Sequence, residues 1–170
     1  MHEFDLINNY FFKIAKKNKF ALNLNDDVFF DKKRGVVISI DTYNIGTHFY
    51  DFKSPDLVIK KILRSSISDL ICKGVTPKFY FISGSGNKKT FTKNNLYKIS
   101  KSLKSEQNKF KIDLCGGDTT FSNKLSFFEN IVSPPHSAML NIFCSDLSDF
   151  EIFTKFFFVN VFLFPDPEIK

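Results

Sequence analysis

Alternating apolar and polar residues mark the segments that we expect to form strands. Residues 36–41 read Val-Val-Ile-Ser-Ile-Asp, and this β-branched alternation is typical of a strand with one buried face. A polar, hairpin-like link precedes this strand at residues 31–35. Shorter apolar segments predict four more strands, at residues 28–30, 78–83, 110–115 and 124–132.

Apolar residues at helical spacing predict three helices. In residues 3–16 they recur every three or four positions, which indicates an amphipathic helix. Residues 54–56 (Ser-Pro-Asp) are a start signal for a second helix, and Gly74 is expected to end it. Thr92 is expected to cap a third helix. Residues 84–87 (Gly-Ser-Gly-Asn) are interpreted as a flexible loop that could act as a lid.

The composition is that of an ordinary globular domain with a basic surface. Of the 170 residues, 43% are hydrophobic and 25% are charged, the net charge is +6 and the pI is about 9.1. The lysines are scattered rather than gathered into a long block. This distribution indicates a solvated surface, or attraction of small phosphorylated molecules, and we expect no binding to nucleic acid.

Cysteine usage and hydropathy bear on the compartment. Cys72, Cys115 and Cys144 are odd in number and lack the spacing of a zinc site, which indicates a reducing compartment, and we expect the cytoplasm. The first residues do not resemble a signal peptide. The apolar run at residues 156–164 is about half a membrane span and is interrupted by Asn160. We therefore expect no membrane association.

The end of the strand at residues 36–41 carries the first candidate chemistry. Asp41 lies where a strand delivers a side chain to a sheet edge or crevice, and ligands of open α/β sheets bind near strand ends. His48 follows a short loop that Gly46 allows to turn. One interpretation is a metal-binding carboxylate and a substrate-facing histidine. The alternative is that Asp41 caps a turn and His48 is an ordinary loop residue.

Three further aspartates occupy positions where a cation would help. Asp26 and Asp27 directly precede a strand, where they could form a simple turn or chelate a divalent cation. Asp69 lies near the C-terminal end of the second predicted helix, where a carboxylate opposes the helix dipole. A positive partner would relieve this, and either a bound metal or a surface lysine could supply it.

A glycine-rich turn follows the strand expected at residues 110–115. Gly116 and Gly117 would let the backbone approach phosphate oxygens closely, and Asp118 and Thr119 suit a metal–phosphate complex. A hairpin turn built on Gly-Gly-Asp is the alternative.

Four motifs occur in the order and spacing of a known family. Together with the opening Glu-Phe-Asp-Leu-Ile, they make the chain resemble the N-terminal domain of bacterial thiamine-monophosphate kinase, within the aminoimidazole ribonucleotide synthetase superfamily. The motifs are Asn-Asp-Asp at 25–27, Ser-Ile-Asp-Thr with Gly-Thr-His-Phe at 39–49, Ser-Asp-Leu with Lys-Gly-Val-Thr-Pro at 68–77, and Gly-Gly-Asp-Thr-Thr at 116–120.

The resemblance implies a fold and a reaction. The fold is α+β, a mixed β-sheet with helices packed on one face, like the N-terminal domain of aminoimidazole ribonucleotide synthetase, and the expected element order permits it. In the family this domain forms a homodimer through the sheet. The implied reaction uses ATP and Mg²⁺ to phosphorylate thiamine phosphate, giving thiamine diphosphate.

The resemblance also implies roles for individual residues. Three positions depart from the family pattern: Asn25 replaces a glycine, Ser66 an asparagine and Phe121 an arginine, and the last change removes a positive charge near the phosphates. The matching positions are Asp27, Asp41, Asp69 and Asp118 as magnesium ligands, Ser39 and Ile40 as positions that assist the metal cluster, His48 as a substrate contact, and Gly117 with Asp118 as the nucleotide-phosphate loop.

The chain divides in two by character. Residues 1–132 carry every motif and are expected to form the ATP- and metal-binding domain, whereas residues 133–170 are Phe-rich, contain no glycine and are interpreted as a divergent, truncated second domain. Two functions follow from this division. The chain is either a thiamine-monophosphate kinase truncated to its N-terminal half, or a non-catalytic remnant that dimerises or binds metal and nucleotide.

Overall fold

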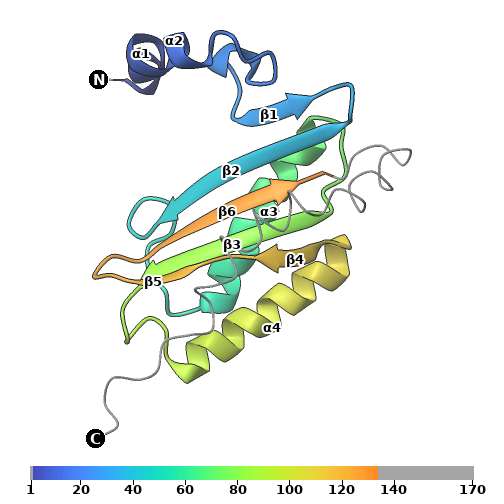
Figure 1. The fold of residues 1–170 in the computed structure, drawn as a ribbon. Helices are drawn as coiled ribbons and strands as arrows, with labels where there is room; N and C mark the ends of the chain where they lie inside the picture. The colour runs from blue at the N-terminus through green and yellow to red at the C-terminus, as the bar shows by residue number, and fades with distance from the viewer. Residues whose placement is uncertain (1, 134–170) are drawn as a thin grey trace, which may run out of the picture.

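The structure is a computed structural model, and it describes residues 2–133. A helical N-terminus leads into a sheet flanked by two long helices (Figure 1). The segment expected at residues 133–170 lies, apart from its first residue, outside the described residues. In chain order the elements are α1 (Glu3–Leu6), the π-helical turn η1 (Ile7–Phe11), α2 (Phe12–Ala15), the short turn η2 (Leu22–Leu24), β1 (Val28–Asp31), β2 (Val36–Asn44), α3 (Pro55–Cys72), β3 (Phe79–Gly86), α4 (Lys93–Phe110), β4 (Asp113–Gly116), β5 (Thr119–Phe121) and β6 (Ser126–Val132).

The strands form one mixed sheet. Its order is β1-β2-β6-β3-β4, and β5 pairs with β3. Neighbours from β1 to β3 run antiparallel, whereas β3 runs parallel to both β4 and β5. α3 crosses one face of the sheet, and α4 packs against α3 on the β4 side (Figure 1). The expected α+β class, a mixed sheet with helices on one face, is confirmed.

Alternation along the strands separates a face covered by α3 from an open face. On β2, Val37 and Tyr43 are buried in the core that β2 shares with α3, whereas Ile40 points to the opposite face and is 64% exposed. Apolar burial of this kind fixes how α3 lies over β2 and β6. The other members of the core are the α3 stripe Val58, Ile59, Ile62, Leu63, Ile67 and Leu70, and the strand residues Tyr80, Phe127 and Ile131.

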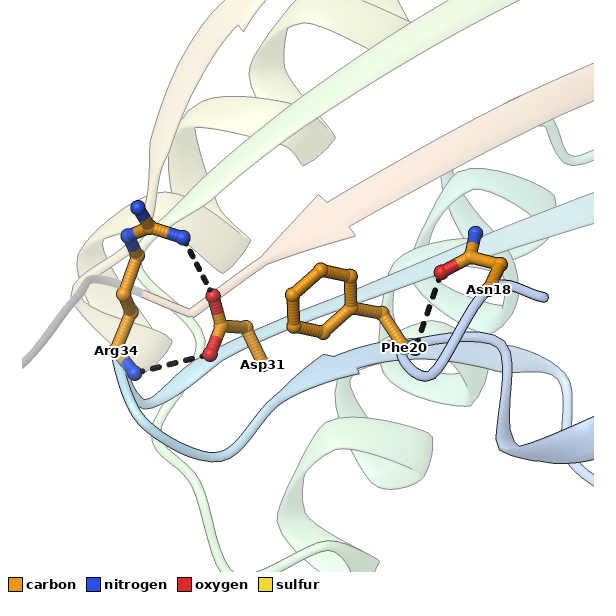
Figure 2. Close-up of polar contacts among 4 residues, drawn as sticks. All are labelled: Asn18, Phe20, Asp31 and Arg34. Atoms are coloured by element: carbon orange, nitrogen blue, oxygen red, sulfur yellow. Dashed lines mark hydrogen bonds and ion pairs between the residues drawn. The ribbon is translucent and has the colours of Figure 1, made fainter.

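The link between β1 and β2 is closed by one pair of side chains. Asp31 is buried at the end of β1, and Arg34 donates to it twice, from the backbone N–H to Oδ1 at 3.1 Å and from Nη1 to Oδ2 at 2.9 Å (Figure 2). Gly35 follows with φ +69°, a region that favours glycine. The loop before β1 is held similarly, because Asn18 Oδ1 accepts the N–H of Phe20 (Figure 2). The expected polar hairpin is confirmed.

The expectation of a flexible loop or lid at residues 84–87 is wrong for its first three residues, Gly84–Gly86. These residues continue β3 and pair with β6 on one side and β5 on the other. A Cβ at Gly84 would lie 3.2 Å from the Phe127 ring and 3.3 Å from the Phe91 ring. The glycine therefore makes room for aromatic side chains inside a sheet rather than providing mobility.

The two long helices begin and end largely where the sequence predicts. Thr92 caps α4 with its side chain, and Gly74, at φ +73°, follows the end of α3. Ser54 precedes α3 as expected, but its hydroxyl makes no capping hydrogen bond. α4 extends through Phe110, which was expected in a strand, because the left-handed residue Lys111 (φ +57°) ends the helix only there. β4 is correspondingly shorter than expected.

The N-terminal helix forms but does not bury its apolar face. Helical structure covers residues 3–15 without a break, as α1, the π-helical turn η1 and α2. Phe4 is 71% exposed and Ile14 is 80% exposed. The amphipathic pattern therefore predicts the helix correctly, while among the described residues these side chains find no core to enter.

Within residues 2–133, no helix is both long enough and apolar enough to cross a membrane. Cys72 and Cys115 are free thiols. Cys144 lies outside the described residues.

Candidate functional site

The site begins where the covered face of β2 meets the middle of α3. Ser66 is 1% exposed, and its hydroxyl donates to Asp41 Oδ2 at 2.9 Å. Tyr43 OH lies 3.0 Å from the same Ser66 oxygen. Since the single hydroxyl hydrogen of Ser66 goes to Asp41, the Tyr43 hydroxyl must donate to Ser66. A chain of donors from Tyr43 through Ser66 thus fixes the Asp41 carboxylate, and burial raises the pKa of Tyr43.

Two more carboxylates lie beside Asp41. Asp69, one turn after Ser66 on α3, lies close enough to Asp41 and Asp27 to feel the negative charge of both. Burial raises the pKa of Asp69, and the negative charges of Asp41 and Asp27 raise it further. The structure therefore brings Asp27, Asp41 and Asp69 into one negative cluster, which we call the acidic cluster.

Glu129 adds a fourth acidic group that the sequence analysis missed. It pairs directly with Asp41 across β2 and β6, and only 1% of it is exposed. Burial raises the pKa of Glu129 to about 8, and the charges of Asp41 and Asp69 contribute to this rise. The alternation of residues along β6 could have revealed it. Phe127 and Ile131, two positions to either side of Glu129, are both core residues, so Glu129 faces the core as well.

Ser39 and Ile40 point to opposite faces of β2. Ser39 is 1% exposed on the covered face, and its hydroxyl has no hydrogen-bond partner among the described residues. Ile40 lies on the open face, so only its backbone could assist a metal on the covered side. Ser39 is thus placed to offer an oxygen, and the metal-assisting roles of both residues stay predictions.

His48 lies where the chain leaves β2 and is tied to the same region. Its Nδ1 accepts the backbone N–H of Asn44 at 2.9 Å, so in the neutral ring the hydrogen is on Nε2. Its ring packs edge-on against Tyr43, with 5.7 Å between the ring centres. Lys61 donates to the His48 carbonyl oxygen from α3. The expected substrate contact at His48 stays a prediction.

Asp118 lies apart from the acidic cluster. Its backbone N–H donates to Ser83 Oγ at 3.1 Å, and its carbonyl oxygen accepts the N–H of Gly84 at 2.9 Å, which holds Asp118 against β3. β6 and β3 lie between Asp118 and β2, so three strand spacings, roughly 14 Å, separate its backbone from that of Asp41. The structure therefore brings Asp27, Asp41 and Asp69 together and places Asp118 beyond β3, and the metal-binding roles of all four stay predictions.

Gly117 is required by packing. A Cβ at this position would lie 1.8 Å from the carbonyl oxygen of Ile82, so no side chain fits. The sequence analysis linked this glycine to close approach of a phosphate, whereas the structure shows close approach to β3. Its predicted part in phosphate binding is untested.

Lys73 pairs with Asp26 rather than with a member of the acidic cluster. Lys73 forms an ion pair with Asp26, and this hydrogen bond raises the pKa of Lys73. Within residues 2–133, no ion pair includes Asp69, so the lysine partner considered from the sequence is not found there. Asp26 and Asp27 also border a hollow of about 450 Å³ between the N-terminal helices and β1.

Comparison with known proteins decides the family. The family model described as AIR synthase related protein, N-terminal domain, matches residues 24–133. The chain belongs to this family. The match includes β1 through β6 and every candidate residue described above.

Relatives of this AIR synthase related domain include thiamine-monophosphate kinases. The Haemophilus influenzae kinase is 32% identical over 127 residues, which are 72% of this chain and 38% of that protein. The Aquifex aeolicus thiamine monophosphate kinase structure has a TM-score of 0.65 at 23% identity, covering 79% of this chain and 43% of that one. AaThiL complexed with AMPPCP and TMP also has a TM-score of 0.65, at 24% identity, covering 77% and 41%. The chain thus spans less than half the length of the relatives it matches, and the resemblance to the kinase N-terminal domain is confirmed.

The donor atoms of the AIR synthase related domain suit a hard divalent cation. All the candidate ligands are oxygens, which Mg²⁺ prefers, and a cation would offset the mutual repulsion of Asp27, Asp41 and Asp69. In the described part of the chain, no three His, Cys, Asp or Glu side chains surround one position that could hold a metal. The residues therefore fit Mg²⁺ by chemistry and charge, and the carboxylates must turn toward the ion when it binds.

Proposed function

We propose that this chain binds Mg²⁺ and ATP and phosphorylates thiamine phosphate to thiamine diphosphate. The observation that carries the proposal is the acidic cluster, which lies within the domain that the chain shares with thiamine-monophosphate kinases. AaThiL, of the same fold, is known complexed with AMPPCP and TMP. Activity and substrates are proposed rather than transferred, because the chain spans 38% of the Haemophilus influenzae kinase.

The proposed part of the described residues in this reaction is to bind Mg²⁺ through negatively charged side chains. Asp27, Asp41 and Asp69 would hold Mg²⁺, with help from Ser39 and the backbone of Ile40. Bound Mg²⁺ neutralises phosphate oxygens, and phosphoryl transfer needs little more than such neutralisation and positioning. Tyr43 and Ser66 keep the Asp41 carboxylate oriented.

Other residues would contact the rest of the ligands. Gly117 and Asp118, about three strands from Asp41, would contact nucleotide phosphate or a second ion rather than the ion at Asp41. His48 would contact thiamine phosphate at the end of β2. The backbone of Asp118 is held against β3, and its Oδ1 accepts the N–H of Thr119 at 2.7 Å.

The open face of the sheet supports a homodimer as part of the same proposal. Ile40 on β2 is 64% exposed and Phe128 on β6 is 47% exposed, and both lie on the face that α3 does not cover. Exposed apolar groups on neighbouring strands are suited to burial against a second copy. We place this dimer in the cytoplasm, in keeping with the free thiols of Cys72 and Cys115.

A second candidate is a module that binds metal and nucleotide without catalysis. It is favoured by the acidic cluster itself, since the roles proposed for Asp27, Asp41 and Asp69 are binding roles that need no turnover. Both candidates use the same acidic cluster and differ only in turnover.

The deciding experiment incubates the full chain with MgATP and thiamine phosphate and measures thiamine diphosphate by chromatography. The kinase proposal predicts product from the wild type and at least about a hundredfold less from Asp41→Asn, because a lost metal ligand removes stabilisation of phosphate charge. Lys53→Ala, an exposed loop variant, is the control and should retain full activity. Binding of MgATP without turnover would support the module, and neither binding nor turnover would contradict both candidates.

A further inference from the structure

We propose that Glu129 is an additional cation ligand, which with Asp41 and Ser39 forms the inner wall of the site on the covered face of the sheet. The proposal rests on the metal site of the proposed function and adds a ligand to it. It gives a role to a buried carboxyl group whose burial the packing of the fold does not explain. The ligand class is a divalent cation that prefers oxygen donors.

Position supports this assignment. Glu129 and Asp41 are direct partners in the pairing of β2 with β6, so their side chains leave the sheet on the same face, about 5 Å apart at Cβ. Ser39 projects from the same face of β2, two residues earlier, and pairs there with Ile131. Three oxygen-bearing side chains from two adjacent strands thus lie beneath α3, next to Asp69.

The hydrogen-bond inventory supports it independently. Glu129 is 1% exposed, and neither of its carboxylate oxygens has a hydrogen-bond partner among the described residues. The Ser39 hydroxyl is likewise buried without a partner there. Ser66 is a donor beside Glu129, but its one hydroxyl hydrogen goes to Asp41, and the Tyr80 hydroxyl, which also feels Glu129, makes no hydrogen bond among the described residues. Buried polar atoms left unpaired in this way are costly, and a bound cation would satisfy them together.

The charge around Glu129 points the same way. No arginine or lysine pairs with it among residues 2–133. Its charged neighbours on β2 and α3 are the aspartates Asp41 and Asp69. The other buried glutamate, Glu106, shows the ordinary solution, since Arg64 binds it at 2.7 and 2.9 Å. Glu129 has no such partner, and a cation held by Asp41 would supply one.

The test measures Mn²⁺ binding to the full chain by the electron paramagnetic resonance signal of free Mn²⁺, without nucleotide. Glu129→Gln keeps the shape but cannot ionise to bind a cation, and it should weaken Mn²⁺ binding about tenfold or more. Glu106→Gln is the matched control, because it neutralises a buried glutamate outside the cluster, and its Mn²⁺ affinity should equal that of the wild type. Unchanged Mn²⁺ affinity in Glu129→Gln would overturn the proposal.

Two further variants separate the possible failures. Asp69→Asn should also weaken Mn²⁺ binding, so a loss in Asp69→Asn with none in Glu129→Gln rejects the role of Glu129 and leaves the proposed function intact. No Mn²⁺ binding by the wild type would reject both. Glu129→Leu guards against a folding artefact, since an apolar side chain suits this buried position without metal. It should stay folded by circular dichroism and lose Mn²⁺ affinity as Glu129→Gln does.

Discussion

At the scale of single residues, the candidate site is marked by how few hydrogen-bond donors face its carboxylates. Tyr43 and Ser66 supply one donated hydrogen bond to Asp41, and the charges of Asp41 and Asp27 help to raise the pKa of Asp69. Glu129 receives no hydrogen bond among the described residues. The side chains are therefore arranged for a ligand of positive charge, and removing any donor should change how Asp41 is held.

Ser66→Ala tests this arrangement. The change removes the hydroxyl between Tyr43 and Asp41 and should lower Mn²⁺ affinity several-fold, because Asp41 loses the donor that orients it. Mn²⁺ titration of the full chain measures the effect. Ser100→Ala, at an exposed serine on α4 whose hydroxyl donates to the Tyr97 carbonyl oxygen, is the control and should bind as the wild type does. Equal affinities in the two variants would show that Ser66 does not position Asp41.

Gly117→Ala tests the packing of the phosphate-loop candidate. A methyl group 1.8 Å from the Ile82 carbonyl oxygen forces backbone movement, and we expect a loss of about 2–3 kcal/mol in the free energy of unfolding. Gly86→Ala is the comparison, because its nearest neighbours, at 3.1 Å, are side-chain atoms of Phe91 and Thr90 that can shift. Urea unfolding of both variants decides the matter, and equal losses would argue against the tight contact at Gly117.

Sequence reasoning found the candidate residues that carry motifs and missed the one that does not. Asp27, Asp41 and Asp69 stand in recognisable patterns, and the structure brings them together. Glu129 lies in a plain strand, and only the pairing of β2 with β6 places it beside Asp41. That pairing joins residues far apart in the chain, which local patterns do not specify.

At the scale of elements, α3 is the most predictable part of the chain and the one on which the site is built. Its apolar stripe specifies which side faces the sheet, and the same rotation places Ser66 and Asp69 toward Asp41. The ends of β3 and β4 were harder to predict. Gly84–Gly86 read as a loop locally, but strand partners on both sides hold them in the sheet.

The contact between α3 and α4 gives a pH dependence. Hydrogen bonds from Arg64 lower the pKa of Glu106 below its ordinary value of 4.5. A lowered pKa in the folded state means that the ion pair stabilises the protein above about pH 4.5 and that this stabilisation is lost as pH falls through the folded pKa. The Tm of Glu106→Gln should therefore be below that of the wild type at pH 7, and the two values should converge in more acidic solution. A Tm difference that persists unchanged to the most acidic pH at which both fold would contradict this.

At the scale of the whole molecule, one sheet face is covered by helices and the other is open within the described residues. The alternation along β2 and β6 did not specify which face is covered, since the apolar side chains of Ile40 and Phe128 lie on the face away from the core. What occupies the open face is outside the reach of local patterns, because it depends on the association of copies. The homodimer proposed above is one answer.

Phe128→Glu tests that dimer. A charge in the middle of the open face should disfavour burial against a second copy and shift the chain toward the monomer in sedimentation velocity. Tyr50→Glu, at a loop residue that is 97% exposed, is the control and should leave the sedimentation profile unchanged. A wild type that is already monomeric at all concentrations tested would contradict a dimer through the sheet.

The most direct test of the whole account is a crystal structure of the full chain grown with Mn²⁺ and a non-hydrolysable ATP analogue, with anomalous diffraction recorded to locate the metal. The account predicts an anomalous peak within about 2.5 Å of carboxylate oxygens from both Asp41 and Asp69. A bound nucleotide with no metal at these residues, or metal bound only elsewhere in the molecule, would contradict it.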